Sequence, residues 1–279
     1  MSITSNFISS SLTKSILTDA IELHKHGAYI TGKVGGRIVS NEILNNEKRK
    51  CDICGLFDDA TKYDEEVGET NLEARETLFD IMGDLREMLQ DELNIGLSES
   101  MELQYLHYPG LIQRPSPQKQ QRRQEEKQQR GGGFYKRHYD HTADDDNNEL
   151  IRKVSVLLYL NDDNWDAKND GGILRAYINT SQHQNNGNND VEVQDVIPAG
   201  GKLVLFDSAS VEHEVLPTFK ERWAVVGWFM QENKSKSNND SKVGAGKKTK
   251  TKKRLQHHSN DVEEQSSSKR RRKKKRRRR

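Results

Sequence analysis

Two residues in the middle of the chain, His138 and Asp140, have the types and spacing of metal ligands. They belong to the stretch 134–141, and side chains two positions apart in an extended segment point to the same face. Tyr139, between them, then points to the other face. One imidazole and one carboxylate on one face, roughly 6–7 Å apart at their Cα atoms, can bind a single divalent metal ion.

A third ligand must come from elsewhere in the chain, and His213 in the stretch 211–217 is the candidate. Two histidines and one carboxylate occupy half of an octahedron and leave the other half open, as in non-haem Fe(II) oxygenase sites. The His-x-Asp pair alone is a weak signal, because a chain with nine histidines and many aspartates can contain one by chance. The neighbouring segments must therefore decide.

The segments around these ligands read as short strands separated by turns. Turn residues occur at 162–164, 169–172 and 198–201. Short strands without intervening helices favour packed antiparallel sheets over a parallel α/β sheet. The predicted strands are 100–108, 134–138, 153–160, 172–177, 191–196, 202–206, 213–216 and 222–229.

Two amphipathic helices are predicted before the strands, over residues 12–26 and 71–94, because apolar residues recur there at intervals of three and four. Residues 28–31 indicate a short strand, and residues 33–70 read as an irregular loop. The predicted fold class is therefore mainly β: a double-stranded β-helix (jelly roll) with N-terminal helices packed on one sheet. The predicted domains are a helical support region (1–99), the jelly-roll domain (100–231) with a low-complexity insert (111–132), and a tail (232–279).

Charge is distributed unevenly along the chain. Residues 233–279 hold 20 Lys/Arg against 4 Asp/Glu, a net charge of +16, whereas residues 1–232 hold 25 against 39, a net charge of −14. A tail with this density of like charges is predicted to be disordered. Its two basic clusters, 247–254 and 268–279, indicate nuclear import through an importin, or an RNA contact. The expected location is the nucleus, the cytoplasm or both.

Other classes of function find little support in the sequence. The acidic body argues against nucleic acid binding by the folded part. No apolar run approaches the roughly 18–20 residues that span a bilayer, so no membrane partner is expected. The two cysteines, Cys51 and Cys54, form a lone Cys-x-x-Cys, which we interpret as structural because a zinc knuckle needs two more ligands nearby.

Five further motifs follow the His138–Asp140 pair along the chain, and the last of them begins with His213. This series resembles the Fe(II)- and 2-oxoglutarate-dependent prolyl 4-hydroxylases, and most closely the Egl-nine-type (hypoxia-inducible factor) prolyl hydroxylases. The resemblance covers about residues 100–230. The motifs that carry it are Val154–Asn161 (VSVLLYLN), Asn164–Lys168 (NWDAK), Gly171–Tyr177 (GGILRAY), Pro198–Asp207 (PAGGKLVLFD) and His213–Arg222 (HEVLPTFKER).

The resemblance implies a role for several further residues. His138, Asp140 and His213 would hold Fe(II), with 2-oxoglutarate and O2 as co-substrates and ascorbate as reductant. Arg222, nine residues after His213, matches the arginine that binds the far carboxylate of 2-oxoglutarate, and a guanidinium can do so with two parallel hydrogen bonds. Tyr159 matches the tyrosine that would share that carboxylate, and Tyr108 and Trp228 match pocket aromatics. Tyr135 is a further candidate pocket residue.

The implied reaction is the hydroxylation of a prolyl residue in a protein substrate, with oxygen sensing as one role it could serve. Two alternatives stay open, because a shared site does not fix the substrate. The first is a 2-oxoglutarate oxygenase that acts on nucleic acid. The second is an inactive jelly-roll module with an RNA-binding tail.

Overall fold

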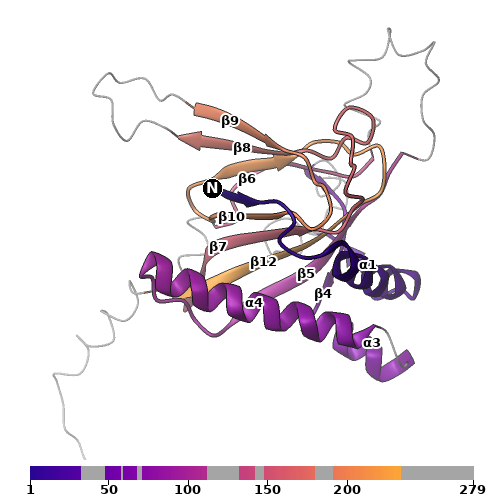
Figure 1. Cartoon of the computed structure of the whole chain (residues 1–279), viewed down its shortest axis with the longest axis horizontal. Helices are drawn as coiled ribbons and strands as arrows, with labels where there is room; N and C mark the ends of the chain where they lie inside the picture. The colour runs from indigo at the N-terminus through magenta and orange to yellow at the C-terminus, as the bar shows by residue number, and fades with distance from the viewer. Residues whose placement is uncertain are drawn as a thin grey trace, which may run out of the picture. The chain divides into compact units, whose positions relative to one another are not determined.

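The computed structural model describes residues 1–32, 48–57, 59–67, 71–111, 132–141, 148–179 and 191–233. The insert predicted at 111–132 and the basic tail lie almost wholly outside the described residues. The described residues belong to one compact unit, Met1–Lys234, in which two antiparallel sheets face each other and helices cover the outer face of one of them (Figure 1). This is the predicted jelly roll with helices on one sheet.

The larger sheet has seven strands in the order β1-β10-β7-β12-β5-β4-β2. Its centre is β12, which pairs with β5 on one side and β7 on the other. The strands are β1 (Ser2–Thr4), β2 (Ile30–Thr31), β4 (Asp52–Gly55), β5 (Met101–Tyr108), β7 (Leu150–Tyr159), β10 (Leu203–Asp207) and β12 (Arg222–Glu232).

The smaller sheet has five strands in the order β3-β6-β11-β8-β9. Its inner strands carry the candidate metal ligands. The strands are β3 (Arg49–Lys50), β6 (Phe134–His138), β8 (Leu174–Asn179), β9 (Val191–Val196) and β11 (Glu212–Val215).

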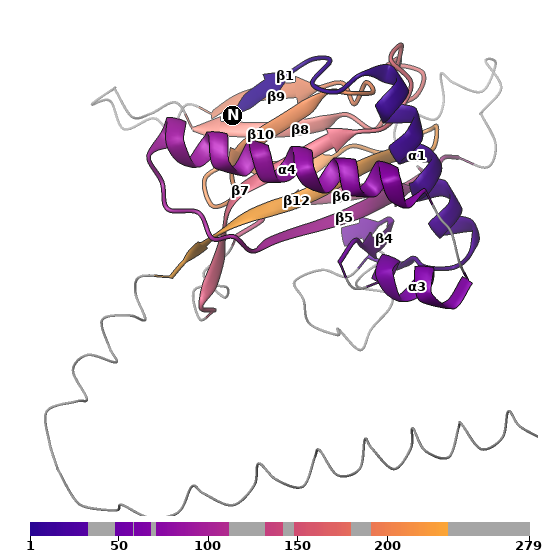
Figure 2. The same cartoon turned by 60° about the horizontal axis from the view of Figure 1, so that its bottom comes forward.

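Three helices complete the described part of the chain: α1 (Ser10–Lys25), α3 (Asp59–Val67) and α4 (Leu72–Leu93). Helix α1 begins at Ser9, whose side chain accepts a hydrogen bond from the Leu12 amide, and α4 ends at Asn94 in the left-handed conformation. Helices α1 and α4 run along the larger sheet on the side away from the smaller one (Figure 2). Among the described residues, no helix is long and apolar enough to cross a membrane.

The larger sheet divides the apolar interior into two clusters. One, with Ile16, Leu78 and Phe229, lies between the helices and the sheet. The other, with Leu106, Phe206 and Ala224, lies between the two sheets. Because side chains alternate along a strand, neighbouring residues of β5 and β12 serve opposite clusters. This alternation separates the candidate catalytic side chains from the helix-facing core.

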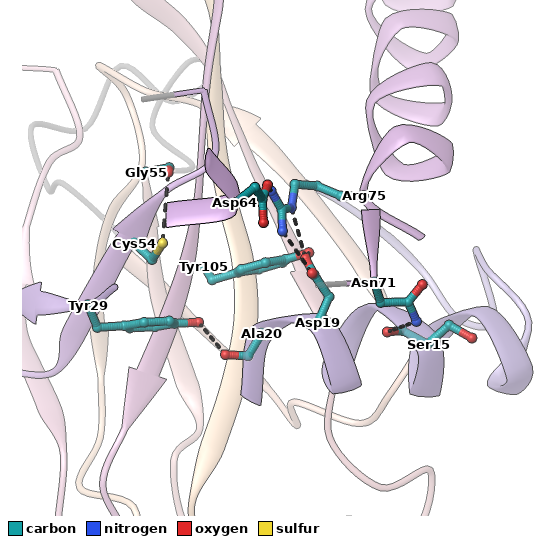
Figure 3. Close-up of polar contacts among 10 residues, drawn as sticks. All are labelled: Ser15, Asp19, Ala20, Tyr29, Cys54, Gly55, Asp64, Asn71, Arg75 and Tyr105. Atoms are coloured by element: carbon teal, nitrogen blue, oxygen red, sulfur yellow. Dashed lines mark hydrogen bonds and ion pairs between the residues drawn. The ribbon is translucent and has the colours of Figure 1, made fainter. Parts of the chain in front are cut away.

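The helices are tied to the sheet by a buried ionic group (Figure 3). The Arg75 guanidinium of α4 donates to both carboxylate oxygens of Asp19 on α1, at 2.8 and 2.9 Å, and to Asp64 of α3 at 2.6 Å. Tyr105 of β5 donates its hydroxyl proton to Asp19 at 2.8 Å. Arg75 and Asp19 are almost fully buried, so this group joins three helices and the central part of the sheet.

The prediction of an irregular loop over residues 33–70 is wrong for its described part. Residues 33–47 are not described, but residues 49–67 form β3, β4 and α3. Strand β4 pairs with β5 and β3 pairs with β6, so both sheets gain a strand from this segment. The strands were missed because two and four residues are too few to show an alternating pattern, and only pairing with distant strands makes them extended.

Candidate active site

The two candidate metal-binding histidines lie side by side on β6 and β11, and the candidate aspartate lies just beyond β6. His213 of β11 is directly opposite His138 of β6, and Asp140 follows the end of β6. His138 Nε2 is 3.6 Å from Asp140 Oδ1, and His213 Nε2 is 3.8 Å from Asp140 Oδ2. The three ligand atoms lie within 4.8 Å of one another. The structure thus brings together residues that are 75 positions apart in the sequence.

Backbone carbonyls orient both imidazoles. Nδ1 of His138 lies 2.8 Å from the Lys136 carbonyl oxygen, and Nδ1 of His213 lies 3.2 Å from the Val211 carbonyl oxygen. A histidine whose Nδ1–H donates to a carbonyl keeps its lone pair on Nε2. In both residues Nε2 is the nitrogen that faces Asp140, so the two lone pairs and the carboxylate converge.

Asp140 is held in its ionised form by its neighbours. Burial alone would raise the pKa of this carboxyl, but His213, His138 and the hydroxyl of Ser155 together hold the pKa well below its usual range. Ser155 donates to Asp140 Oδ2 at 2.7 Å and shares a second hydrogen bond with Ser208 at 2.8 Å. Burial also lowers the pKa of His213, so its imidazole is neutral and able to bind a metal at neutral pH.

A cavity of about 670 Å³ lies between the sheets and reaches the three ligands. The three aromatic residues singled out from the sequence, Tyr108, Tyr135 and Trp228, all line it. The Tyr135 ring stacks on His138, with 3.5 Å between the ring centroids. This volume is within the range of ligand pockets in general.

Arg222 and Tyr159 meet in the interior between the sheets. Arg222 begins β12 opposite Tyr108, and its guanidinium carbon lies 4.8 Å from the ring of Tyr108 and 5.1 Å from that of Tyr159. Its Nε donates to the Gly172 carbonyl at 2.9 Å. Arg222 Nη2 and the Tyr159 hydroxyl are buried but make no hydrogen bond in the structure. Burial raises the pKa of Tyr159 to about 12, so its hydroxyl keeps its proton and can donate it.

Gly172 makes room for Arg222. Its φ is +70°, and a Cβ atom added there would lie 2.8 Å from Arg222 Cδ. Both facts require glycine, because other residues rarely adopt this φ and the arginine would have to move. The turn 169–172 predicted from sequence therefore also positions the candidate co-substrate arginine.

Sequence reasoning missed three residues of this region. Ser155 is a polar residue inside an apolar strand, which was a readable signal, since buried hydroxyls need partners. Arg49 lines the cavity, lies over Tyr135 at 4.6 Å and donates to Cys51 Sγ at 2.8 Å. Arg152 lies over the Trp228 ring at 3.6 Å. The two arginines lie in no motif, so only the fold reveals them.

The two cysteines do not form a common site. Both are free and buried. Cys51 belongs to the core between the sheets, whereas Cys54 belongs to the core under the helices. The pair therefore cannot bind one metal ion, in agreement with a structural role.

Comparison with known proteins agrees with this geometry. Residues 126–230 match the sequence model of the 2OG-Fe(II) oxygenase superfamily. A prolyl 4-hydroxylase from Pseudomonas putida has a similar structure, with a TM-score of 0.55 and 25% identity over 83% of this chain and 92% of that one. Residues 126–230 are therefore similar to 2OG-Fe(II) oxygenases, and the structure is similar to that of a prolyl 4-hydroxylase.

Two further similar proteins come from animals. A hypoxia-inducible factor prolyl hydroxylase of Caenorhabditis elegans is 34% identical over 99 residues, which are 35% of this chain and 12% of that protein. The present chain therefore matches only a small part of that relative. A Trichoplax adhaerens prolyl hydroxylase, solved with a peptide fragment of the hypoxia-inducible factor, has the same fold, with a TM-score of 0.58, 23% identity and coverage of 88% and 87% of the two chains.

The residues of the site fit the Fe(II) ion and the 2-oxoglutarate after which the matched superfamily is named. Two imidazole nitrogens and a carboxylate oxygen are a suitable donor set for Fe(II). The unpaired Arg222 Nη2 and Tyr159 hydroxyl are two buried donors that lack an acceptor, and buried polar groups normally have one. A carboxylate at this place would satisfy both.

Proposed function

We propose that the chain is an Fe(II)- and 2-oxoglutarate-dependent dioxygenase that hydroxylates a prolyl residue in a protein substrate. The observation that carries this proposal is the convergence of His138, Asp140 and His213 on one point of a cavity, with two unpaired donors, Arg222 and Tyr159, in the same interior. A metal triad alone would fit many reactions. The additional buried donors specify an anionic co-substrate.

Each residue of the site has a distinct task in this proposal. The triad would hold Fe(II), which when bound supplies the O2 activation and C–H oxidation coupled to decarboxylation of 2-oxoglutarate. The carbonyl groups of Lys136 and Val211 hold the imidazoles of His138 and His213 with Nε2 toward the metal position. The Ser155 hydroxyl holds the Asp140 carboxylate in place. The buried walls exclude water from the reacting atoms. Ascorbate is proposed as the reductant that keeps the iron ferrous.

A prolyl substrate is supported by the relatives and by the lining of the cavity. Two of the similar proteins above are a hypoxia-inducible factor prolyl hydroxylase and a prolyl 4-hydroxylase. Tyr135 and Trp228 line the cavity and bring aromatic carbon atoms into it, which suits contact with a pyrrolidine ring. We also propose a role in oxygen sensing. This part rests on the similarity to the hypoxia-inducible factor prolyl hydroxylase of Caenorhabditis elegans.

The proposal is tested by offering proline-containing peptides and methylated oligonucleotides to the Fe(II)-loaded full chain with 2-oxoglutarate. The expected result is succinate formation coupled to a mass increase of one oxygen atom on a prolyl residue. Loss of a methyl group from the oligonucleotide instead would replace it by the nucleic acid alternative. No succinate with any substrate would favour the inactive module.

Arg222→Met should raise the KM for 2-oxoglutarate by about 10- to 100-fold for each hydrogen bond lost, because a hydrogen bond to a charged group contributes about 1.5–3 kcal/mol. The methionine keeps most of the buried volume. Arg175→Met is the matched control, since Arg175 lies on the surface of β8 and pairs with Asp195. An unchanged KM in Arg222→Met, or an equal rise in the control, would remove Arg222 from the co-substrate site.

We also propose that the basic clusters at 247–254 and 268–279 direct the protein to the nucleus through an importin. The support is the charge pattern of the tail, +16 in 47 residues. Deleting residues 247–279 from a fluorescent fusion should shift it to the cytoplasm. A fusion that stays nuclear would contradict the import role and would leave RNA contact or a solubilising tail without a partner.

A further inference from the structure

A second group of potential metal ligands lies on the opposite face of the larger sheet. It consists of His24 from the last turn of α1, Asp52 from β4 and His107 from β5. Asp52 and His107 are directly opposite each other in the sheet, and Trp223 is opposite His107 on the other side. The row Asp52, His107, Trp223 thus crosses three strands beneath the end of α1.

The geometry of this group matches that of the candidate iron site. His24 Nε2 is 3.7 Å and His107 Nδ1 is 3.5 Å from Asp52 Oδ2. The corresponding distances in the iron triad are 3.6 and 3.8 Å. In both groups the three ligand atoms lie within 4.8 Å of one another.

These distances suit a shared ion better than hydrogen bonds. Hydrogen bonds to nitrogen are about 2.7–3.2 Å long, whereas two ligands at a tetrahedral angle on one zinc ion are about 3.4 Å apart. His107 is only 4% exposed, and neither of its ring nitrogens makes a hydrogen bond. A buried imidazole that has carboxylate oxygens nearby but no hydrogen bond is a candidate metal ligand, because buried polar groups are otherwise hydrogen-bonded.

The surroundings of His24 and Asp52 favour the protonation states in which these side chains can bind a metal ion. Burial, followed by the neighbouring His107, lowers the pKa of His24 and keeps its imidazole neutral. His107 lowers the pKa of Asp52, so the carboxylate is ionised. On the far side of His107, a Glu221 oxygen lies 3.7 Å from Nε2. A carboxylate behind a metal-bound histidine is a common orienting partner.

We propose that His24, Asp52 and His107 form an accessory site for a divalent ion of the zinc class, separate from the iron site. Two imidazoles and one carboxylate are typical zinc ligands, and the fourth position would be taken by water. The ion would fasten the end of α1 to β4 and β5. His107 and Trp223 directly adjoin Tyr108 and Arg222 in the sequence, so the same clamp would support the strand ends that present the co-substrate arginine.

The first test counts zinc ions on the untagged full chain, stripped with a chelator, re-equilibrated with zinc and analysed by elemental mass spectrometry. His257 and His258 of the tail are replaced by alanine in all variants to remove other imidazoles. The parent should hold two ions, Asp140→Ala one, His24→Ala one, and Asp140→Ala with His24→Ala none. His26→Ala is the matched control, because His26 lies at the same helix end but outside the group, and it should hold two.

The second test follows the ion at its own place in the fold. His107 stacks on Trp223, with ring centroids 4.2 Å apart, so bound Co²⁺ should quench the fluorescence of this tryptophan. In the Asp140→Ala background, quenching should persist, and adding His24→Ala or Asp52→Asn should abolish it. Zinc at 100 times its Kd should also raise the Tm of the Asp140→Ala variant by at least about 5 °C.

The proposal is overturned if the parent binds a single zinc ion that Asp140→Ala removes, or if His24→Ala and Asp52→Asn both keep the second ion. Circular dichroism establishes that the variants are folded. His24 is partly exposed at a helix end, so its replacement leaves the helix core intact. The counts do not depend on oxygenase activity, so failure here would leave the proposed function untouched.

Discussion

Asp140→Ala is expected to abolish 2-oxoglutarate turnover and Fe(II) binding while the chain stays folded. Removing an outer partner of a metal ligand typically costs 10- to 100-fold in metal affinity or activity, so removing a ligand should cost more than about 100-fold. Asp140 lies between both histidines and is the acceptor for Ser155, so alanine leaves two imidazoles without the carboxylate that completes the donor set. Succinate formation and Fe(II) titration measure the two losses.

The control for this prediction is Asp195→Ala. Asp195 is a surface carboxylate on β9 that pairs with Arg175 and is outside the cavity lining. It should keep the turnover and Fe(II) affinity of the parent. If Asp140→Ala still binds Fe(II) and forms succinate at the parental rate, the triad is not the metal site.

Arg75→Met should lower the free energy of unfolding by about 3–5 kcal/mol, the cost of leaving a buried charge without its partner. Arg75 is 1% exposed and holds Asp19, which is fully buried, with two hydrogen bonds. Chemical denaturation followed by circular dichroism measures the loss. Changing Asp19 to Asn as well should recover part of it, because the remaining group is then uncharged.

Arg175→Met serves as the control for this effect too. Its pair with Asp195 has the same two-fold geometry, with both hydrogen bonds at 2.8 Å, but each side chain is more than a third exposed. Exposed ion pairs contribute about 0–1 kcal/mol. Equal losses in the two variants would mean that burial does not decide the strength of the Arg75 group.

The strands that build the jelly roll could be predicted from sequence because their signals are local. β5, β6, β9 and β12 begin at or within one residue of the predicted starts, since alternation and turn residues define them. The fold class followed from the absence of helices between these strands. Helix α4 was equally accessible, because its apolar residues repeat over 22 positions.

The missed parts depend on long-range pairing. β3 (Arg-Lys) and β4 (Asp-Ile-Cys-Gly) are too short to show a strand pattern, and they become strands only against β6 and β5. The accessory group has the same cause. His24, Asp52 and His107 are separated by 27 and 54 intervening residues, and only the strand register and the end of α1 bring them together. No sequence motif records such an arrangement.

The position of β12 at the centre of the larger sheet limits how this protein can evolve. Arg222 faces the interior between the sheets, and Trp223, the next residue, faces the helices. A deletion of one residue between Val225 and Trp228 would turn one half of the strand over, because the faces alternate. Either Arg222 or Trp228 would then leave the interior between the sheets. β12 can therefore accumulate substitutions over generations, but the number of residues between Arg222 and Trp228 must stay the same.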